Sequence, residues 1–202
     1  ERAARNAYGR LVAFVASRSR DVTAAEDALS EAFTAALQTW PETGVPDNPE
    51  AWLLVAARRR HLDEVRHQQV QTRAVPLLAV FDEASERSSA DDVFPDDRLK
   101  LMFICAHPAI DASVRTPLML QTVLGLDAAT IASAFLTAPA AMGQRLARAK
   151  TRIKLAAIPF RLPERAELPE RLQAVLAAIY AAFTTGWTDP GSPENQTRDL
   201  TR

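Results

Sequence analysis

The side chains best suited to a chemical task lie between residues 138 and 161, where basic residues gather and acidic residues are absent. If this stretch is helical, Met142, Leu146, Ala149 and Ile153 share one face at a period of about 3.6 residues. The opposite face then carries Ala141, Gln144, Arg145, Arg148, Thr151 and Arg152. Arginine pairs with guanine and glutamine with adenine through two hydrogen bonds each, so this face is suited to reading bases in a DNA major groove.

The elements around this helix predict a helix-turn-helix over residues 126–154. Asp127 is expected to cap a first helix that turns Ile131, Ala134 and Phe135 inward. A break at 136–139 follows, and Pro139 is tolerated there because it opens the second helix. A helix pair with one basic face is also compatible with a simple solvated surface, and that alternative stays open.

A second candidate surface lies on a predicted helix that starts at a capping box, Thr23 to Glu26, and stops at Pro41. Its apolar stripe is expected to hold Ala25, Ala28, Leu29, Ala32, Phe33, Ala36, Leu37 and Trp40. Its other side carries Asp27 and Glu31, four residues apart, so the two carboxylates are neighbours. This acidic face is either solvated or a docking surface for a basic partner.

A third candidate surface follows the proline-rich loop at 41–49. Asn48 is expected to cap a helix that runs from Pro49 to about His67. The predicted inward side chains of this helix are Trp52, Val55, Ala56, Leu62 and Val65, and the predicted outward ones are Arg58, Arg59, Arg60, Arg66 and His67. Trp52 is either a core residue or a platform on which a base stacks.

The remaining segments predict an all-α fold, because none shows the two-residue alternation of strands. Further helices are expected at 1–20, from Asp96 to Pro108 with Leu99 inward, from Ser113 to Gly125, and at about 170–185. The last of these carries an apolar stripe that needs a partner surface. Residues 70–95 are acidic, serine-rich and without helical period, and they predict a linker.

Composition limits the function further. The 202 residues have a net charge of −1, so any nucleic-acid binding must be local. No serine, cysteine or carboxylate constellation typical of catalysis is present, Asp63 and Glu64 would lie exposed among arginines, and Cys105 with His107 lacks metal-ligand spacing. We therefore expect no enzyme activity, no metal and no cofactor.

No apolar run approaches the length of a membrane span. A single cysteine and the lack of a signal-peptide pattern at Glu1 predict a cytoplasmic location.

Two sets of motifs in the right order carry a family resemblance. The stretches are AEDALSEAFTAALQTWP (25–41), NPEAWLLVAARRRHLDEVR (48–66) and the predicted helix-turn-helix (126–154). Together they resemble an extracytoplasmic-function sigma factor of the sigma-70 family. The stretches FPDDRLKLMFICAHPAI (94–110) and AAMGQRLARAKTRIKLAAIPFRLP (140–163) resemble the subgroup with a tetratricopeptide-like helical extension.

The resemblance implies a division into sigma domain 2 (1–69), a linker (70–95), sigma domain 4 (96–158) and the start of the extension (159–202). Its implied partners are promoter DNA and core RNA polymerase, through the beta-prime coiled coil and the beta subunit. The implied polymerase-binding residues are Glu26, Asp27, Glu31 and Phe33. The implied −10 contacts are Asn48, Trp52, Arg58, Arg59 and Arg66. The implied −35 contacts are the six outward residues of the helix at 139–155.

Departures from the family pattern concern single positions. Arg59 stands where the family often has Asn, Thr130 where an acidic residue is common, and Gly143 where a larger side chain is usual. The main alternative is an autonomous helix-turn-helix regulator, which would bind DNA without polymerase and leaves 25–66 unexplained. A further hypothesis is that the 170–185 helix docks on a sigma domain and regulates it.

Overall fold

The structure is a computed structural model that describes residues 2–72 and 96–188. Within those ranges every regular element is an α-helix, which confirms the predicted all-α fold. The helices are α1 (Arg2–Ser19), α2 (Val22–Thr43), α3 (Pro49–Thr72), α4 (Arg98–Cys105), α5 (Ala112–Leu124), α6 (Ala128–Ala134), α7 (Pro139–Leu155) and α8 (Leu168–Thr188). None of these helices is long and apolar enough to cross a bilayer.

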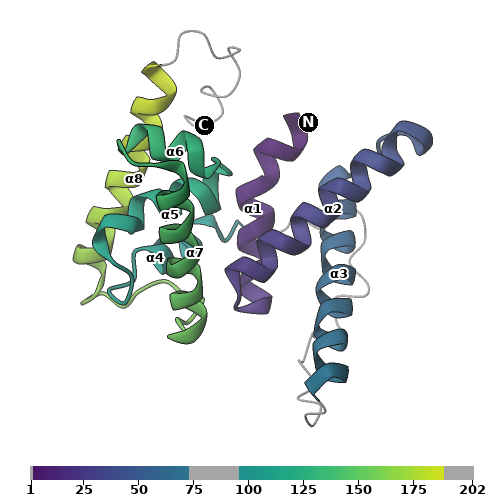
Figure 1. Ribbon diagram of the computed structural model, residues 1–202, viewed down its shortest axis with the longest axis horizontal. Helices are drawn as coiled ribbons and strands as arrows, with labels where there is room; N and C mark the ends of the chain where they lie inside the picture. The colour runs from purple at the N-terminus through teal and green to yellow at the C-terminus, as the bar shows by residue number, and fades with distance from the viewer. Residues whose placement is uncertain (1, 73–95, 189–202) are drawn as a thin grey trace.

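The helices form two groups that share a continuous apolar core. α2 and α3 pack against each other and against α1, and α4 to α8 form the second group (Figure 1). α1 lies between the groups, because it also packs on α4 and α5. The core side chains Leu11, Leu29 and Leu53 from the first group and Leu118 and Ile131 from the second are almost fully buried.

The predicted bounds of α2 are wrong at both ends. The capping residue is Asp21, whose Oδ1 accepts a hydrogen bond from the amide of Ala24 at 3.1 Å, so Thr23 already lies inside the helix. Asp21 takes this role because its backbone is extended while the apolar Val22 begins the buried face. At the other end the helix continues through Pro41 to Thr43, although a proline at this position cannot donate a backbone hydrogen bond to the preceding turn. Leu37, expected inside, is 70% exposed.

α3 begins as predicted and ends later than predicted. Asn48 Oδ1 accepts a hydrogen bond from the amide of Ala51 at 3.0 Å, which confirms the cap. The buried face consists of Leu53, Leu54 and Ala57, and the predicted core residue Val55 is 51% exposed. The face that meets α1 and α2 is therefore rotated from the one that sequence periodicity indicated. The side chains of Leu62 and Val65, which were also predicted to face inward, are not among those that the structure describes.

The second group also departs from the sequence prediction at two helices. In α4 the buried side chains are Leu101, Phe103, Ile104 and Cys105, and Leu99 is exposed rather than inward. α8 packs on α5 and α4 through Arg171, Val175 and Ala178. Of the apolar stripe predicted at about 170–185, Val175 is buried, and the other members are exposed: Leu172, Leu176, Ile179, Tyr180 and Phe183. The predicted linker lies outside the described residues, apart from 70–72 at the end of α3.

Candidate nucleic-acid interface

The candidate DNA-reading element is built from α6, a tight turn and α7. Asp127 caps α6 as predicted: its Oδ1 accepts hydrogen bonds from the amides of Ala129 and Thr130, both at 2.9 Å. Its Oδ2 accepts a third bond from the Thr130 hydroxyl at 2.8 Å. The bonds from Thr130 hold the pKa of Asp127 below its usual value, because they favour the charged carboxylate. Leu136 then adopts a left-handed backbone with φ 50° and reverses the chain.

α7 presents the two faces that its sequence predicts. Met142, Leu146, Ala149 and Ile153 are buried, and all six side chains of the predicted base-reading face are exposed: Ala141, Gln144, Arg145, Arg148, Thr151 and Arg152. The structure thus brings these six residues together on one open surface. For α6 the inward prediction is right for Ile131 and wrong for Ala134 and Phe135, since only Ile131 and Ala132 of this two-turn helix reach the core.

The predicted −10 residues lie on α3 and the loop before it. Asn48 uses its side-chain oxygen to cap α3. Trp52 is half-buried and meets Trp40 edge to face, with the ring centroids 5.4 Å apart, so it is anchored in the α2–α3 packing. Arg58 is half-buried and Arg59 is exposed on the same helix. Arg66 lies in α3, and its side chain is outside the described part.

The predicted polymerase-binding residues of α2 do not form one open surface. Asp27 and Glu31 are exposed, and Glu31 pairs with Arg60 at 3.4 Å. Phe33 is half-buried and stacks on Tyr8 with 6.5 Å between ring centroids. Glu26 is only 12% exposed, because it is covered by α7 and pairs with Lys150 at 2.6 Å. Burial raises the pKa of the Glu26 carboxyl, and the ammonium group of Lys150 opposes that rise.

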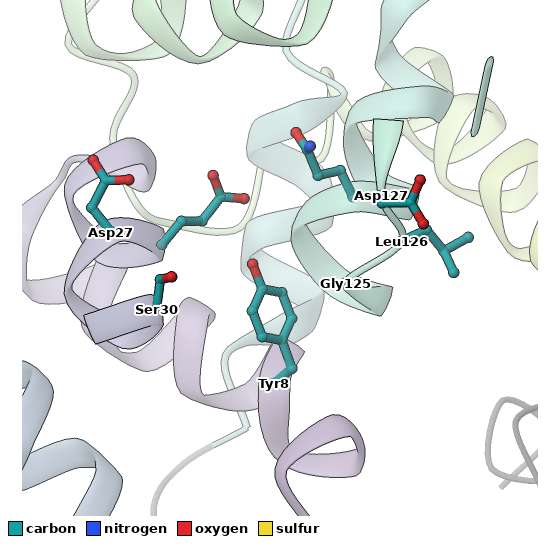
Figure 2. A pocket seen from close by; sticks show the side chains of 8 residues that line it. Tyr8, Asp27, Ser30, Gly125, Leu126 and Asp127 are labelled. Atoms are coloured by element: carbon teal, nitrogen blue, oxygen red, sulfur yellow. The ribbon is translucent and has the colours of Figure 1, made fainter. Parts of the chain in front are cut away.

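A cavity of about 280 Å³ lies beside Glu26, between the start of α2 and the α5–α6 corner (Figure 2). Tyr8, Asp27 and Ser30 line one side of it, and Gly125, Leu126 and Asp127 line the other. Glu26 Oε1 and Gln121 Oε1 are buried at its edge without a hydrogen-bond partner in the described structure. Among the residues that the structure describes, no group of three His, Cys, Asp or Glu side chains is arranged so that it could hold a metal ion.

Sequence reasoning missed the residues that join α2 to α7. Lys150 and Lys154 lie four residues apart on α7 and pair with Glu26 and Asp21 of α2. The available signal was the match between two carboxylates near the start of α2 and two lysines on one flank of α7. Nothing local in the sequence says that these segments meet.

A comparison with known protein families finds a match for the first group of helices. Residues 4–70 match the family model for sigma-70 region 2, a range that covers most of α1, all of α2 and nearly all of α3. Residues 4–70 are therefore similar to a sigma-70 region 2. The acidic residues of α2 and the arginines of α3 lie within this region, and α4 to α8 lie beyond it.

One relative is similar to this chain over most of its length. An uncharacterized protein of Rhizobium meliloti (strain 1021) is 40% identical over 187 residues, which is 90% of this chain and 44% of that protein. The chain thus spans less than half the length of this relative. No solved structure matches the chain.

Proposed function

We propose that this chain is the promoter-recognising part of a cytoplasmic RNA polymerase sigma factor of the extracytoplasmic-function type. The observation that carries the proposal is the sigma-70 region 2 match over α1 to α3, within which the exposed acids of α2 and the arginines of α3 occur together. Such a protein is a binding subunit: it docks on core polymerase and directs it to promoters, and the polymerase performs the chemistry.

In this proposal the acidic side of α2 binds the beta-prime coiled coil of core polymerase. Asp27 and Glu31 are exposed carboxylates one helical turn apart, so they offer a basic partner two charges on one face. The surface pair between Glu31 and Arg60 opposes docking little, because exposed ion pairs contribute at most about 1 kcal/mol. Glu26 joins the docking surface when α7 moves away from it, and Phe33 lies further along the same helix, stacked on Tyr8.

The arginine side of α3, with the loop before it, is proposed to hold the melted −10 strand. Arg59 is exposed toward solvent, and Arg58 and Arg66 lie on the same helix. Basic side chains along a single strand supply affinity through its phosphates. Trp52 supports this surface from beneath through its contact with Trp40, and Asn48 fixes the start of the helix.

The α6–α7 pair is proposed to be the helix-turn-helix that reads the −35 element. Gln144 and Arg145 lie in the first half of α7, the part of a recognition helix that meets base edges. Arg148, Thr151 and Arg152 follow on the same exposed face and would contact bases or phosphates as the helix leaves the groove. The base contacts supply sequence specificity, and the phosphate contacts supply salt-dependent affinity.

The test is transcription by core RNA polymerase reconstituted with the full chain on a pool of genomic fragments. We expect start sites that share upstream elements, and we expect Arg148→Ala/Arg152→Ala to reduce their use. The matched control is Arg161→Ala/Arg165→Ala, which removes the same charge outside the recognition helix. If the chain binds duplex DNA and yields no polymerase-dependent transcripts, the autonomous regulator takes the place of the sigma factor.

A further inference from the structure

The cavity beside Glu26 carries two buried acceptor atoms that lack donors. Glu26 Oε1 and Gln121 Oε1 are both buried, and neither has a hydrogen-bond partner in the described structure. The Glu26 side chain is only 12% exposed, and its other oxygen, Oε2, lies 2.6 Å from Lys150 Nζ. A buried acceptor without a donor costs free energy, and such groups usually mark the place of a bound molecule or an ordered water. The adjoining space of about 280 Å³ has room for either.

Carboxylates line this cavity from both sides. Asp27 approaches it from α2, and Asp127 approaches it from the α5–α6 corner (Figure 2). Lys150 compensates the charge of Glu26, so the lining retains the negative charges of Asp27 and Asp127. A cavity lined by one sign of charge concentrates ions of the opposite sign, so its charge favours a cation over a neutral molecule or an anion.

Tyr8 forms an aromatic wall between the two sides, with its hydroxyl directed between them (Figure 2). Its ring lies so close to Gly125 that a Cβ atom added there would be 2.9 Å from a ring carbon. Burial raises the pKa of the Tyr8 hydroxyl, and the carboxylates of Glu26 and Asp27 raise it further. The hydroxyl therefore stays protonated, so it adds a neutral polar group that can donate or accept a hydrogen bond.

We propose that this cavity binds a small organic cation, a primary ammonium group on a short alkyl chain. An ammonium group has three N–H donors and no acceptor, which matches Glu26 Oε1, Gln121 Oε1 and the carboxylate of Asp27. The alkyl chain would lie along Leu126 and the ring of Tyr8. Drug-sized ligands occupy about 300–1,000 Å³, so a smaller cavity suits a ligand of few heavy atoms.

Water is the competing occupant. One water molecule can donate two hydrogen bonds, and polar cavities of sufficient size commonly hold ordered water. Water carries no charge, however, so it satisfies the two buried oxygens and leaves the carboxylates of the lining without a counterion. The two occupants are distinguished by whether a cation binds in preference to a neutral molecule of the same shape.

Nuclear magnetic resonance of the full chain with isotope-labelled tyrosine rings tests the site. The sequence has two tyrosines, Tyr8 in the cavity and Tyr180 on α8, so the second is an internal control. We expect the diamine putrescine, added at constant ionic strength, to shift the Tyr8 signals saturably and to leave the Tyr180 signals in place. Butanediol of the same chain length replaces the ammonium groups by hydroxyls and should shift neither set.

Three variants separate a specific site from general charge attraction. Asp27→Asn removes one carboxylate of the lining at an exposed position and should weaken putrescine binding at least about tenfold, the usual effect of losing a charge-assisted hydrogen bond. Glu31→Gln is the matched control, because it makes the same change of charge one turn along α2 at a residue outside the lining. Gln121→Met keeps a side chain of similar length without the amide oxygen and should weaken binding about fivefold. Unchanged Tyr180 signals show that each variant is folded.

Tyr8 signals that ignore putrescine, or that respond equally to butanediol, would overturn the cation site and leave water as the occupant. Equal weakening by Asp27→Asn and Glu31→Gln would show attraction to the helix surface in general and would also overturn it. Unchanged affinity in Gln121→Met would contradict recognition through the buried oxygens. Neither polymerase nor DNA enters this experiment, so its outcome is independent of the proposed function.

Discussion

The carboxylate of Asp127 stabilises the start of α6, the first helix of the proposed helix-turn-helix. Asp127 accepts three hydrogen bonds, two of them from amides that the first turn of α6 leaves without a helical partner. α6 is short, so it gains little from helix propensity and depends on this cap and on the burial of Ile131.

We therefore expect Asp127→Ala to lower the free energy of unfolding by about 1 kcal/mol. Asp127→Asn is the matched control, because asparagine caps as well as aspartate and lacks the charge. Urea unfolding followed by circular dichroism measures both variants. Equal loss in the two variants would mean that charge, rather than the hydrogen bonds to the backbone, holds the turn.

Cys105 provides a second prediction at the residue scale. Its thiol is fully buried beside the Thr122 hydroxyl, with 3.6 Å between sulfur and oxygen, and burial raises its pKa to about 12. A raised pKa keeps the thiol protonated, so only about one part in ten thousand is thiolate at pH 8. A thiol reagent should leave the native chain unmodified for hours and react fully in denaturant. An added exposed cysteine, Gln38→Cys, should react within minutes under native conditions.

At the residue scale, the sequence predicted those features that depend only on near neighbours in the chain. The caps at Asn48 and Asp127 involve partners two or three residues away, and both were predicted. The cap of α2 was misplaced because Asp21 and Thr23 are both good capping residues, and the choice depends on where Val22 packs. The burial of Glu26 was beyond prediction, because its partner Lys150 lies far along the chain.

At the scale of helices, sequence periodicity predicted the buried face best where the opposite face is strongly polar. The stripe of α7 was predicted residue by residue, since arginines mark the opposite face without ambiguity. The helix α8 was predicted, but its buried side was identified only in part, because the helix is apolar around most of its circumference and the sequence leaves the contacting side open. Its buried face includes Arg171, which bonds Glu167 at 3.0 Å.

The contact between α1 and α5 gives a prediction at this scale. Gly9→Ala places a Cβ atom against the backbone of Val123, and two helix backbones yield less easily than a side chain. We expect a loss of about 1–3 kcal/mol in the free energy of unfolding, as for other overpacked sites. Gly143→Ala is the matched control in α7, where nothing lies within 4 Å of the added atom. That variant should gain up to about 1 kcal/mol from helix propensity.

If Gly9→Ala is as stable as the wild type, the close approach of α1 to α5 does not hold the two groups together in solution. Urea unfolding of both glycine variants, monitored at one helix-sensitive wavelength, makes the comparison.

At the scale of the whole molecule, the sequence predicted which elements exist and left open how they meet. The candidate surfaces on α2, α3 and α7 were each visible as charged faces of amphipathic helices. Their spatial relation was not, because the pairing of Asp21 and Glu26 with Lys154 and Lys150 joins segments separated by most of the chain. In the structure α2, the proposed docking helix, is in contact with α7, the proposed reading helix.

The central claim is that this chain is a subunit of RNA polymerase holoenzyme. Its most direct test is binding of the full chain to core RNA polymerase, with the wild type compared with Asp27→Lys/Glu31→Lys. Both positions are exposed, so the reversed charges leave the core intact and the circular dichroism spectrum unchanged. Glu164→Lys/Glu170→Lys makes the same change in net charge at exposed positions outside α2.

The account predicts that the wild type and the Glu164→Lys/Glu170→Lys control bind core polymerase with similar affinity and that Asp27→Lys/Glu31→Lys loses binding at least tenfold, about 1.4 kcal/mol. A wild-type chain that ignores polymerase, or a folded Asp27→Lys/Glu31→Lys variant that binds as tightly as the wild type, would contradict it.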